Sequence, residues 1–365
     1  MTTSGIQGTG DAPGQSRYDG LDLFRPFSIF GVVLIHFSQA LVLPPTPAFL
    51  FFVRVRDCAL PIMVLTSFFV LTRALMADPG RTFARFAAGR FRRLVVPCVI
   101  WTALYWVMFE VAGPLWSGGQ AAWPPATRWL SGFIHLWFLQ FLFVGGVILF
   151  PLIRWIVRHP RLRWMSAAAC VAAAAVYWAW SAPHLSSDAV LSWVQDADVS
   201  LKVAIRQSVV YAKYPLLGVA IALVADPLAG FYRRPAFRAA TVLAAVGALA
   251  VHANASAPAV SRIVYSLAVF IALLRPWTPG ALGWLRPIAR YSYPIYIVHP
   301  AVAPVVAGAF AVWQMGPSLP GWLAGSVVVF ALSGAAAVLL RKPVPADWFL
   351  PLVRMPERGA GTGMG

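Results

Sequence analysis

Residues 321–340 read GWLAGSVVVFALSGAAAVLL, a stretch without a single charged side chain. An α-helix rises about 1.5 Å per residue, so this stretch covers roughly 30 Å, the thickness of the hydrocarbon core of a bilayer. Similar stretches recur along most of the chain. We predict transmembrane helices at residues 22–43, 48–71, 94–112, 133–153, 165–181, 207–225, 237–252, 260–274, 289–310 and 321–340. The expected fold class is an all-α integral membrane bundle of about ten helices, in which the Ala-rich stretches 165–181 and 237–252 are the weakest.

The composition excludes an ordinary soluble domain. Hydrophobic residues make up 60% of the chain and charged residues 11%, whereas roughly 25% of a soluble domain is charged. The net charge of +17 is compatible in principle with nucleic-acid binding. The basic residues lie in short segments between apolar stretches, however, and not on one soluble face, so we expect no nucleic-acid partner. The natural partner of such a chain is the lipid bilayer.

The distribution of basic residues predicts the orientation. If the N-terminus is cytoplasmic, 22 of the 29 Lys and Arg residues fall on the cytoplasmic side, as the positive-inside rule requires. We therefore expect both termini inside. Residues 1–16 are predicted to be a disordered cytoplasmic tail, 17–345 the membrane domain and 346–365 a second cytoplasmic tail. Arg far outnumbers Lys and Ala is abundant, which favours a bacterial source and placement in the inner membrane.

Charged and imidazole side chains inside the spans need a reason, because Arg, Lys or Asp at mid-membrane costs about 2.5–3.5 kcal/mol on insertion scales. The first span holds Asp22, Arg25 and His36. Eleven residues return a helix to nearly the same face, so His36 lies on the stripe of Arg25, about 16 Å further along the helix. The alternative is structural: an ion pair at the helix start and a histidine bonded to a neighbouring helix. We favour a functional role for His36, since an imidazole titrates near neutral pH.

Arginines gather in the cytoplasmic connection between the second and third spans. Arg90, Arg92 and Arg93 are the last of this cluster. Each alone is explained as a topology signal, but together they suit a phosphate-rich cytoplasmic ligand, because Arg binds phosphate with two parallel hydrogen bonds.

Polar residues also mark three other spans. Arg54 and Asp57 are spaced for an ion pair and are expected at the outer mouth, where a purely structural role is the alternative. His135 and Trp137 begin the fourth span from outside. The ninth span carries a polar stripe that ends in a histidine: Tyr293, Tyr296 and His299. We assign these seven residues to a polar path, although interhelical hydrogen bonding explains His135 nearly as well.

Five separated segments, in order, resemble the integral-membrane acyltransferase family 3, which includes bacterial O-antigen and exopolysaccharide O-acetylases. The first is Leu21-Asp22-x-x-Arg25 followed by His36. The others are PIMVLTSFF at 61–69, RFRRLVVP at 90–97, HLWFL at 135–139 and SYPIYIVH at 292–299. The resemblance covers residues from about 17 to 340. Two departures concern packing only: Phe68 and Ala289 stand where the family favours Gly.

The resemblance implies transfer of an acyl group, acetyl in particular, from cytoplasmic acyl-CoA to a hydroxyl of a carbohydrate or glycolipid. In that reading His36, Arg25 and Asp22 are catalytic, and Arg25, Arg90, Arg92 and Arg93 bind acyl-CoA. The acceptor path holds His135, Trp137, Tyr293, Tyr296, His299, Arg54 and Asp57. Acyl-CoA is a co-substrate, and we expect neither a permanently bound cofactor nor a metal, since the cysteines lack metal-ligand spacing.

A transporter of anionic or acylated solutes is the alternative function, with the same polar stripe as its permeation path. Inverted repeats with broken helices would favour it, and the sequence has none that we can identify. The acceptor, the acyl chain length, a covalent acyl-histidine step and the oligomeric state all stay open at this stage.

Overall fold

The computed structural model describes residues 19–41, 44–112, 132, 135–184, 199–232, 234–256, 258–274, 284–313 and 317–341. The predicted tails, 1–16 and 346–365, lie outside them. The described residues form helices and no strand. These are α1 (Asp19–Ala40), α2 (Pro47–Arg56), α3 (Ala59–Ala77), α4 (Phe83–Arg90), η1 (Phe91–Val95), α5 (Val96–Trp106), η2 (Val107–Ala112), α8 (Trp137–Arg158), η3 (Pro160–Leu162), α9 (Arg163–His184), α11 (Val199–Tyr211), α12 (Lys213–Tyr232), α13 (Pro235–Ala253), α14 (Pro258–Leu273), α15 (Leu285–Val312) and α16 (Leu319–Arg341).

The predicted fold class is confirmed. Among the described residues, nine helical segments are long and apolar enough to cross a membrane, and each corresponds to a predicted span. The tenth prediction, 260–274, corresponds to the shorter apolar helix Ala259–Leu273. Ala259–Leu273 is therefore the short helix of the bundle. The Ala-rich stretches that we considered weakest form the longer segments Pro160–Ser181 and Pro235–Ala253.

The second span is not one continuous helix. It breaks between α2 and α3, at Asp57 and Cys58. Pro61 explains the position of the break, because proline has no N–H to donate to the carbonyl four residues earlier, which is that of Asp57. The break places Asp57 at the junction of two helices, where its side chain can reach across to other elements.

The helix that contains the third span begins at Phe83, before the predicted start of the span at 94. The arginines of this region argued against a membrane span, yet α4 runs into α5 through the π-helical turn η1. Pro97 lies two residues after this turn and removes one backbone donor, which disturbs the regular hydrogen-bond pattern of the helix.

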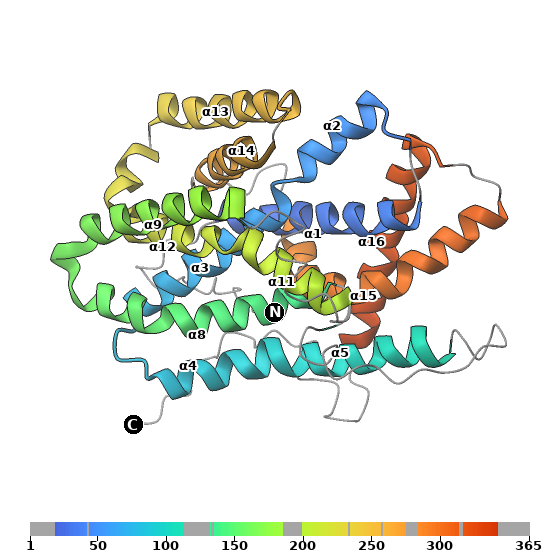
Figure 1. Ribbon diagram of the computed structural model, residues 1–365, viewed down its shortest axis with the longest axis horizontal. Coiled ribbons are helices and arrows are strands. Elements are labelled where there is room, and N and C mark those ends of the chain that lie inside the picture. Colours follow the sequence, from blue (N-terminus) through green and yellow to red (C-terminus); the bar gives the residue numbers. More distant parts are fainter. Residues whose placement is uncertain are drawn as a thin grey trace, which may run out of the picture.

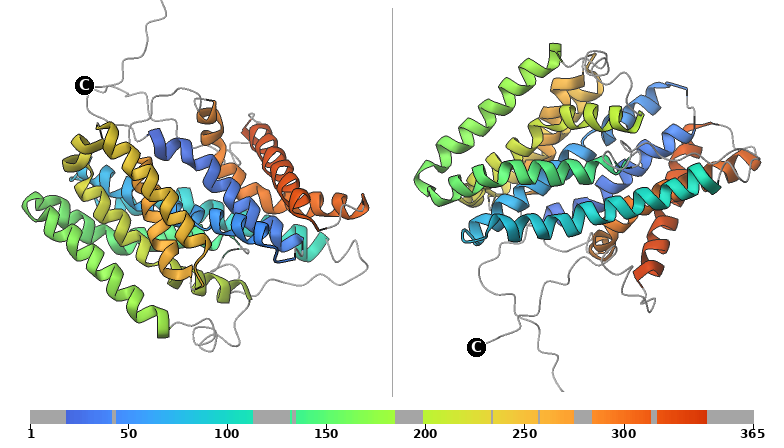
Figure 2. Two further views of the ribbon diagram at one scale, coloured as in Figure 1. Left: turned by 90° about the horizontal axis from the view of Figure 1, so that it is seen from above. Right: turned by 60° about the horizontal axis from the view of Figure 1, so that its bottom comes forward.

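The long helices run roughly side by side along the length of the molecule (Figure 1). Helix α1 packs against α15, α16 and α3, and α12 lies between α3 and α9. Helices α13 and α14 form a pair on one side of the bundle, and α16 crosses at the other end (Figures 1 and 2). The N-terminal helix is thus surrounded by elements from far along the chain.

The contact between α3 and α12 requires a glycine. A Cβ atom added at Gly218 would lie 2.7 Å from the carbonyl oxygen of Leu65. Small residues let membrane helices approach this closely. Arg73 of α3 also pairs with Asp226 of α12. The two helices run in the same direction and are therefore in contact at two places, at Gly218 and about two turns further along at Asp226.

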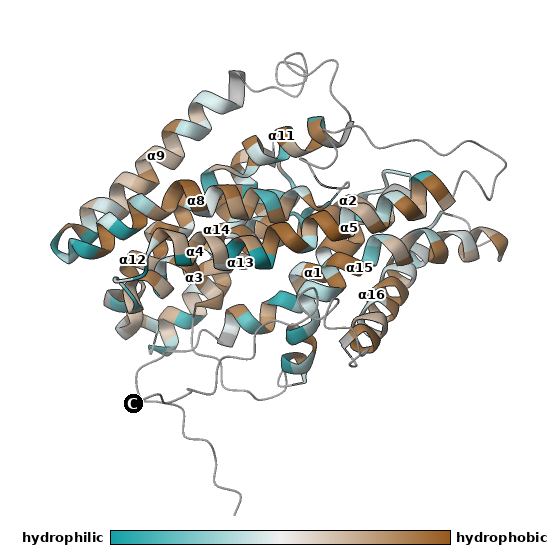
Figure 3. Ribbon diagram, turned by 90° about the horizontal axis from the view of Figure 1, so that it is seen from below, coloured by the Kyte–Doolittle hydropathy of each residue, from teal (hydrophilic) through white to brown (hydrophobic). Residues whose placement is uncertain are grey.

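The exterior of the bundle is apolar, as a protein in lipid requires (Figure 3). Large hydrophobic side chains face outward on several helices, including Val176 on α9, Leu243 on α13 and Val305 on α15, each about 70% exposed. A soluble protein would not display so many of them.

Candidate active site

Three histidines from distant parts of the chain meet inside the bundle. His36 comes from α1, His135 from the residues just before α8, and His299 from α15. The ring centroid of His36 lies 5.7 Å from that of His135 and 5.2 Å from that of His299. The remaining pair, His135 and His299, is 5.4 Å apart. These three residues, which we call the histidine cluster, are all residues that the sequence singled out.

Burial and hydrogen bonding differ among the three rings. His135 and His299 are buried, with 2% and 0% exposure, and His36 is partly exposed. Nδ1 of His299 lies 3.2 Å from the carbonyl oxygen of Ile295. A carbonyl can only accept, so Nδ1 carries the proton and the neutral ring has its lone pair on Nε2. Within the described residues, this Nε2 and both nitrogens of His135 have no hydrogen-bond partner.

Two tyrosines frame the cluster. The hydroxyl of Tyr296 donates to the carbonyl of His135, and its ring centroid lies 5.3 Å from that of His135. The ring centroid of Tyr105 lies 5.5 Å from that of His135, and its hydroxyl donates to the carbonyl of Ile297. The backbone at His135 is therefore fixed by α15, and its ring makes edge-to-face contacts with both tyrosines.

A small cavity of about 30 Å³ borders the cluster. That is enough for one or two water-sized groups. Its walls combine the polar residues with apolar ones: Val32, Ile35, His36, Leu60, His135, Trp137, Phe138 and Tyr296. Within the described residues, no group of three or more His, Cys, Asp or Glu side chains is arranged to hold a metal ion.

The other end of the α1 stripe holds the predicted ion pair. A guanidinium nitrogen of Arg25 lies 3.3 Å from a carboxylate oxygen of Asp22. Both side chains are partly exposed, so this pair is accessible and adds little stability by itself. It lies about half the length of α1 away from His36 and forms a separate, charged region.

The other three predicted donor-binding arginines, besides Arg25, differ in their surroundings. Arg92 and Arg93 are exposed. Arg90 instead packs over the ring of Phe86, 5.5 Å from its centroid, and donates to the carbonyl of Leu142 on α8 at 3.1 Å. A side chain held in this way contributes to packing between α4 and α8, which leaves Arg92 and Arg93 as the accessible members.

Tyr293 is not part of the histidine cluster. Its hydroxyl donates to the carbonyl of Arg93 at 3.0 Å. This carbonyl is the one that Pro97 cannot satisfy, because proline has no N–H to give to the residue four positions earlier. The interaction ties α15 to η1, just before α5. The structure therefore gives Tyr293 a positioning contact near the arginines rather than near His135.

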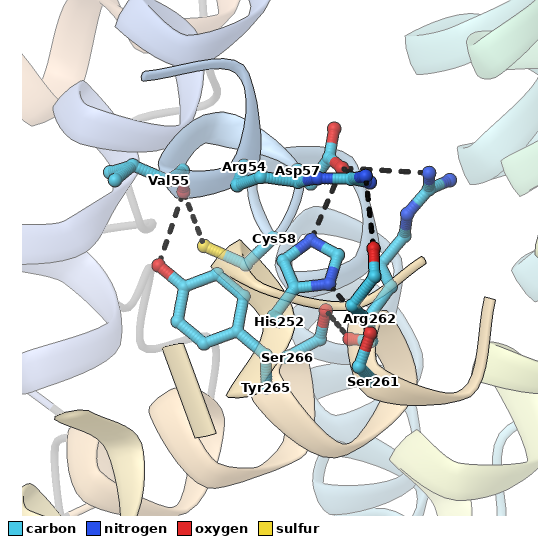
Figure 4. Close-up of polar contacts among 10 residues, drawn as sticks. Arg54, Val55, Asp57, Cys58, His252, Ser261, Arg262, Tyr265 and Ser266 are labelled. Carbon is cyan, nitrogen blue, oxygen red and sulfur yellow. Dashed lines mark hydrogen bonds and ion pairs between the residues drawn. The ribbon is translucent and has the colours of Figure 1, made fainter. Parts of the chain in front are cut away.

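Arg54 and Asp57 join a different group of residues. One carboxylate oxygen of Asp57 lies 4.0 Å from Arg54, 3.5 Å from Arg262 and 3.2 Å from Nε2 of His252. Nδ1 of His252 is 2.9 Å from the hydroxyl of Ser261. Figure 4 shows this group at the α2–α3 junction, with α13 and α14 supplying the other members.

Our reading of the sequence missed His252, Arg262 and Tyr105. His252 and Arg262 lie within predicted spans 237–252 and 260–274, so the cost of polar groups in a membrane, which identified His36, would have found them too. Tyr105 had no such signal, because a lone tyrosine in an apolar helix is ordinary.

Comparison with known proteins identifies the family of the chain. A family model described as an acyltransferase domain matches residues 18–338, which span the histidine cluster, the arginines and every predicted transmembrane helix except the last few residues of the final one. Searches of curated proteins and of solved structures found no match. The chain belongs to the integral-membrane acyltransferase family 3.

Proposed function

We propose that this membrane acyltransferase moves an acyl group, acetyl in particular, from cytoplasmic acyl-CoA to a hydroxyl group of a carbohydrate or glycolipid. The observation that carries the proposal is the meeting of His36, His135 and His299 beside a small cavity. Imidazoles at this position suit proton transfer, because their pKa lies close to neutral pH in solution.

In the proposed reaction the acceptor hydroxyl attacks the thioester carbonyl of acyl-CoA. A new C–O bond forms, the C–S bond breaks, and coenzyme A leaves as the thiol. His36 takes the proton from the attacking hydroxyl and passes one to the departing sulfur. General acid–base catalysis of this kind is worth about 10²–10⁴-fold in rate.

His299 has a supporting part in this scheme. Its Nδ1 is bound to the carbonyl of Ile295, so its Nε2 can accept a proton but cannot donate one while the ring is neutral. With the ring of His36 at 5.2 Å, this lone pair would stabilise the positive charge that His36 gains when it takes the proton. His299 would thus be a positioning residue.

The charged end of the α1 stripe is the proposed donor site. The phosphates of acyl-CoA would lie at Arg25 with the exposed Arg92 and Arg93, at the cytoplasmic mouth. The thioester lies at the end of the long, flexible pantetheine arm. About 16 Å of helix separates Arg25 from His36, and the arm would extend along this distance to bring the thioester to the cavity.

The acceptor is proposed to enter from the outer side, past His135, Trp137 and Tyr296. These residues line the cavity, and Trp137 also lines a larger apolar groove between α8, α9, α11 and α12. An aromatic side chain between a polar cavity and an apolar groove suits the stacking of a sugar ring. We propose the bacterial inner membrane as the site of action.

The experiment is an acceptor-dependent turnover assay with purified full-length protein. Radiolabelled acetyl-CoA is supplied with candidate glycans, and free coenzyme A and labelled product are measured together. The proposal predicts equal amounts of both, produced only when acceptor is present. If label crosses the membrane of a proteoliposome without release of free coenzyme A, the protein moves its substrate rather than acylating it.

A further inference from the structure

The group around Asp57 is a second polar site in the bundle. It contains Arg54, Asp57, His252, Ser261 and Arg262, with His252 between the carboxylate and the serine hydroxyl (Figure 4). These residues come from the α2–α3 junction, from α13 and from α14. Bringing so many polar groups together inside an apolar bundle is costly unless they share a task.

A nucleophilic serine is the first possibility to test. Serine, imidazole and carboxylate in series can activate a hydroxyl for attack on a carbonyl. Exposure decides against it: His252 is 0% exposed and Ser261 only 9%. A nucleophile must reach its substrate, so this pair is better understood as a support that holds the carboxylate of Asp57 in place.

The accessible members of the group are the cations. The side chains of Arg54 and Arg262 are 23% and 29% exposed, more than any other member. Lys213 lies nearby, close enough for its charge and that of Arg262 to repel each other. Among the described residues, Asp57 is the carboxylate that pairs with Arg54 and Arg262, so one negative charge faces two guanidinium groups, and Lys213 adds a further positive charge nearby.

Helix polarity adds to this surplus. Arg262 lies one turn after the start of α14 at Pro258, and the first turn of this helix has no acidic residue. The N-terminal end of a helix is its positive end, so Arg262 sits where a cation is least favourable. Its Nε is buried and has no hydrogen-bond partner within the described residues. Both facts favour an additional anion at this place.

We infer that Arg54 and Arg262, supported by Asp57 and His252, bind a carboxylate or phosphate group carried by the acceptor. A guanidinium group matches both anions with two parallel hydrogen bonds. The inference rests on the proposed function for the identity of the ligand as an acceptor. It narrows the substrate class to anionic glycans, such as uronic-acid or phosphorylated sugars.

The anion site and the catalytic cavity are connected by aromatic residues. The ring of Tyr211 stacks on Trp137 with 5.9 Å between centroids, and Trp137 lines the cavity next to His36. Tyr211 in turn lies within electrostatic range of both Arg262 and Asp57. An acceptor bound through its anionic group would therefore have its sugar ring close to the histidine cluster.

The test is binding without turnover, using purified full-length protein in detergent and no acyl donor. The thermal unfolding midpoint is measured at constant ionic strength against glucose, glucose 6-phosphate and glucuronate. At least one anionic sugar is expected to raise the midpoint, while glucose is not. Arg262→Gln should weaken the apparent affinity at least tenfold, and Lys202→Gln on α11 serves as the matched loss of a charge and should not.

Arg54→Gln is the second variant, for the case in which Arg262→Gln does not fold. Its contacts are long, 4.0 Å to Asp57 and 3.4 Å to the carbonyl of Ala255, so its loss should disturb the support less than the loss of Arg262, and the same weakening of affinity is expected. Equal stabilisation by glucose, or unchanged affinity in the folded variants, would overturn the inference.

Phosphatidylglycerol and phosphatidylcholine are added in parallel to separate the two sources of phosphate. If only phosphatidylglycerol stabilises the protein in an Arg262-dependent way, the site holds a lipid headgroup and the acceptor assignment is overturned. Because no donor is present, anionic sugars can bind as expected even if the transfer assay fails. Conversely, efficient transfer to neutral glycans alone would contradict this inference and leave the proposed function intact.

Discussion

The ring of His36 lies 5.2 Å from the ring of His299, although the two residues belong to the first and the ninth predicted spans. The packing of α1 against α15 produces this neighbourhood. His299 receives its orientation from α15 itself, through the carbonyl of Ile295, whereas His36 faces the cavity. A fixed ring beside an accessible one is the arrangement that a proton-transfer pair needs, and it makes the role of each histidine testable.

His299→Ala and His135→Ala should each lower kcat, by about 10²-fold for His299, because the support of His36 is lost. The affinity for acyl-CoA should not change, since neither ring is near the arginines. Steady-state kinetics with varied acceptor, together with a donor-binding titration, measure both quantities. His159→Ala, at the exposed end of α8, is the control and should behave as wild type. If the variants change thermal stability alone, these histidines only join helices.

Arg25→Ala and Arg90→Ala should have different effects. Arg25 is accessible, and loss of its charge-assisted contact with a phosphate should weaken acyl-CoA binding by about 1.5–3 kcal/mol. Arg90 is committed to Leu142 and Phe86, so its loss should reduce stability more than donor affinity. Isothermal titration with acyl-CoA and a thermal unfolding scan separate the two. If Arg25→Ala binds acyl-CoA as tightly as wild type, Arg25 contributes only to membrane topology and not to donor binding.

Gly218→Ala should destabilise the bundle by about 1–3 kcal/mol, the usual cost of overpacking. The added methyl group would meet the backbone carbonyl of Leu65 at 2.7 Å, and backbone cannot move aside as a flexible side chain can. Gly247→Ala on α13 is the matched control, because a Cβ there has no atom within 4 Å. A thermal unfolding scan in detergent compares the two. Equal midpoints for both variants would mean that α3 and α12 have room between them.

Both termini are predicted to be cytoplasmic. Fusion of a reporter that is active only in the cytoplasm should give signal at either end, and a reporter active only outside should not. The physical reason is the placement of 22 of the 29 basic residues, which sets topology through the positive-inside rule. Opposite results at the two ends would indicate an odd number of membrane crossings. The short helix Ala259–Leu273 would then be the one that does not cross the membrane.

Much of the fold could be predicted because the bilayer imposes it. The length and apolarity of a span are local properties, so 321–340 and its counterparts were identifiable one at a time. The break at Asp57 was less obvious, although its cause, Pro61, is local as well. The helix of the third span begins earlier than the predicted apolar stretch, because α4 and η1, which carry the arginines, continue the same helix on its N-terminal side.

The site divides in the same way. His36, His135 and His299 could be selected singly, because each is a polar residue in an apolar helix. Their convergence depends on which helices are neighbours, and the sequence of a bundle with many helices does not specify this. The same holds for Arg54 and Asp57. Their i,i+3 ion pair was predictable, but its contact with His252 and Arg262 depends on the packing of α13 and α14 beside the α2–α3 junction.

Single-turnover transfer by His36→Ala tests the central claim most directly. Purified wild-type and variant protein are mixed with labelled acetyl-CoA and a glycan that the wild type acylates, with His159→Ala as control and thermal unfolding to verify the fold. We predict that His36→Ala binds acetyl-CoA normally and unfolds at nearly the same temperature, but transfers the label at least about 10²-fold more slowly. A folded His36→Ala protein that transfers at the wild-type rate would contradict the assignment of His36 as the catalytic base.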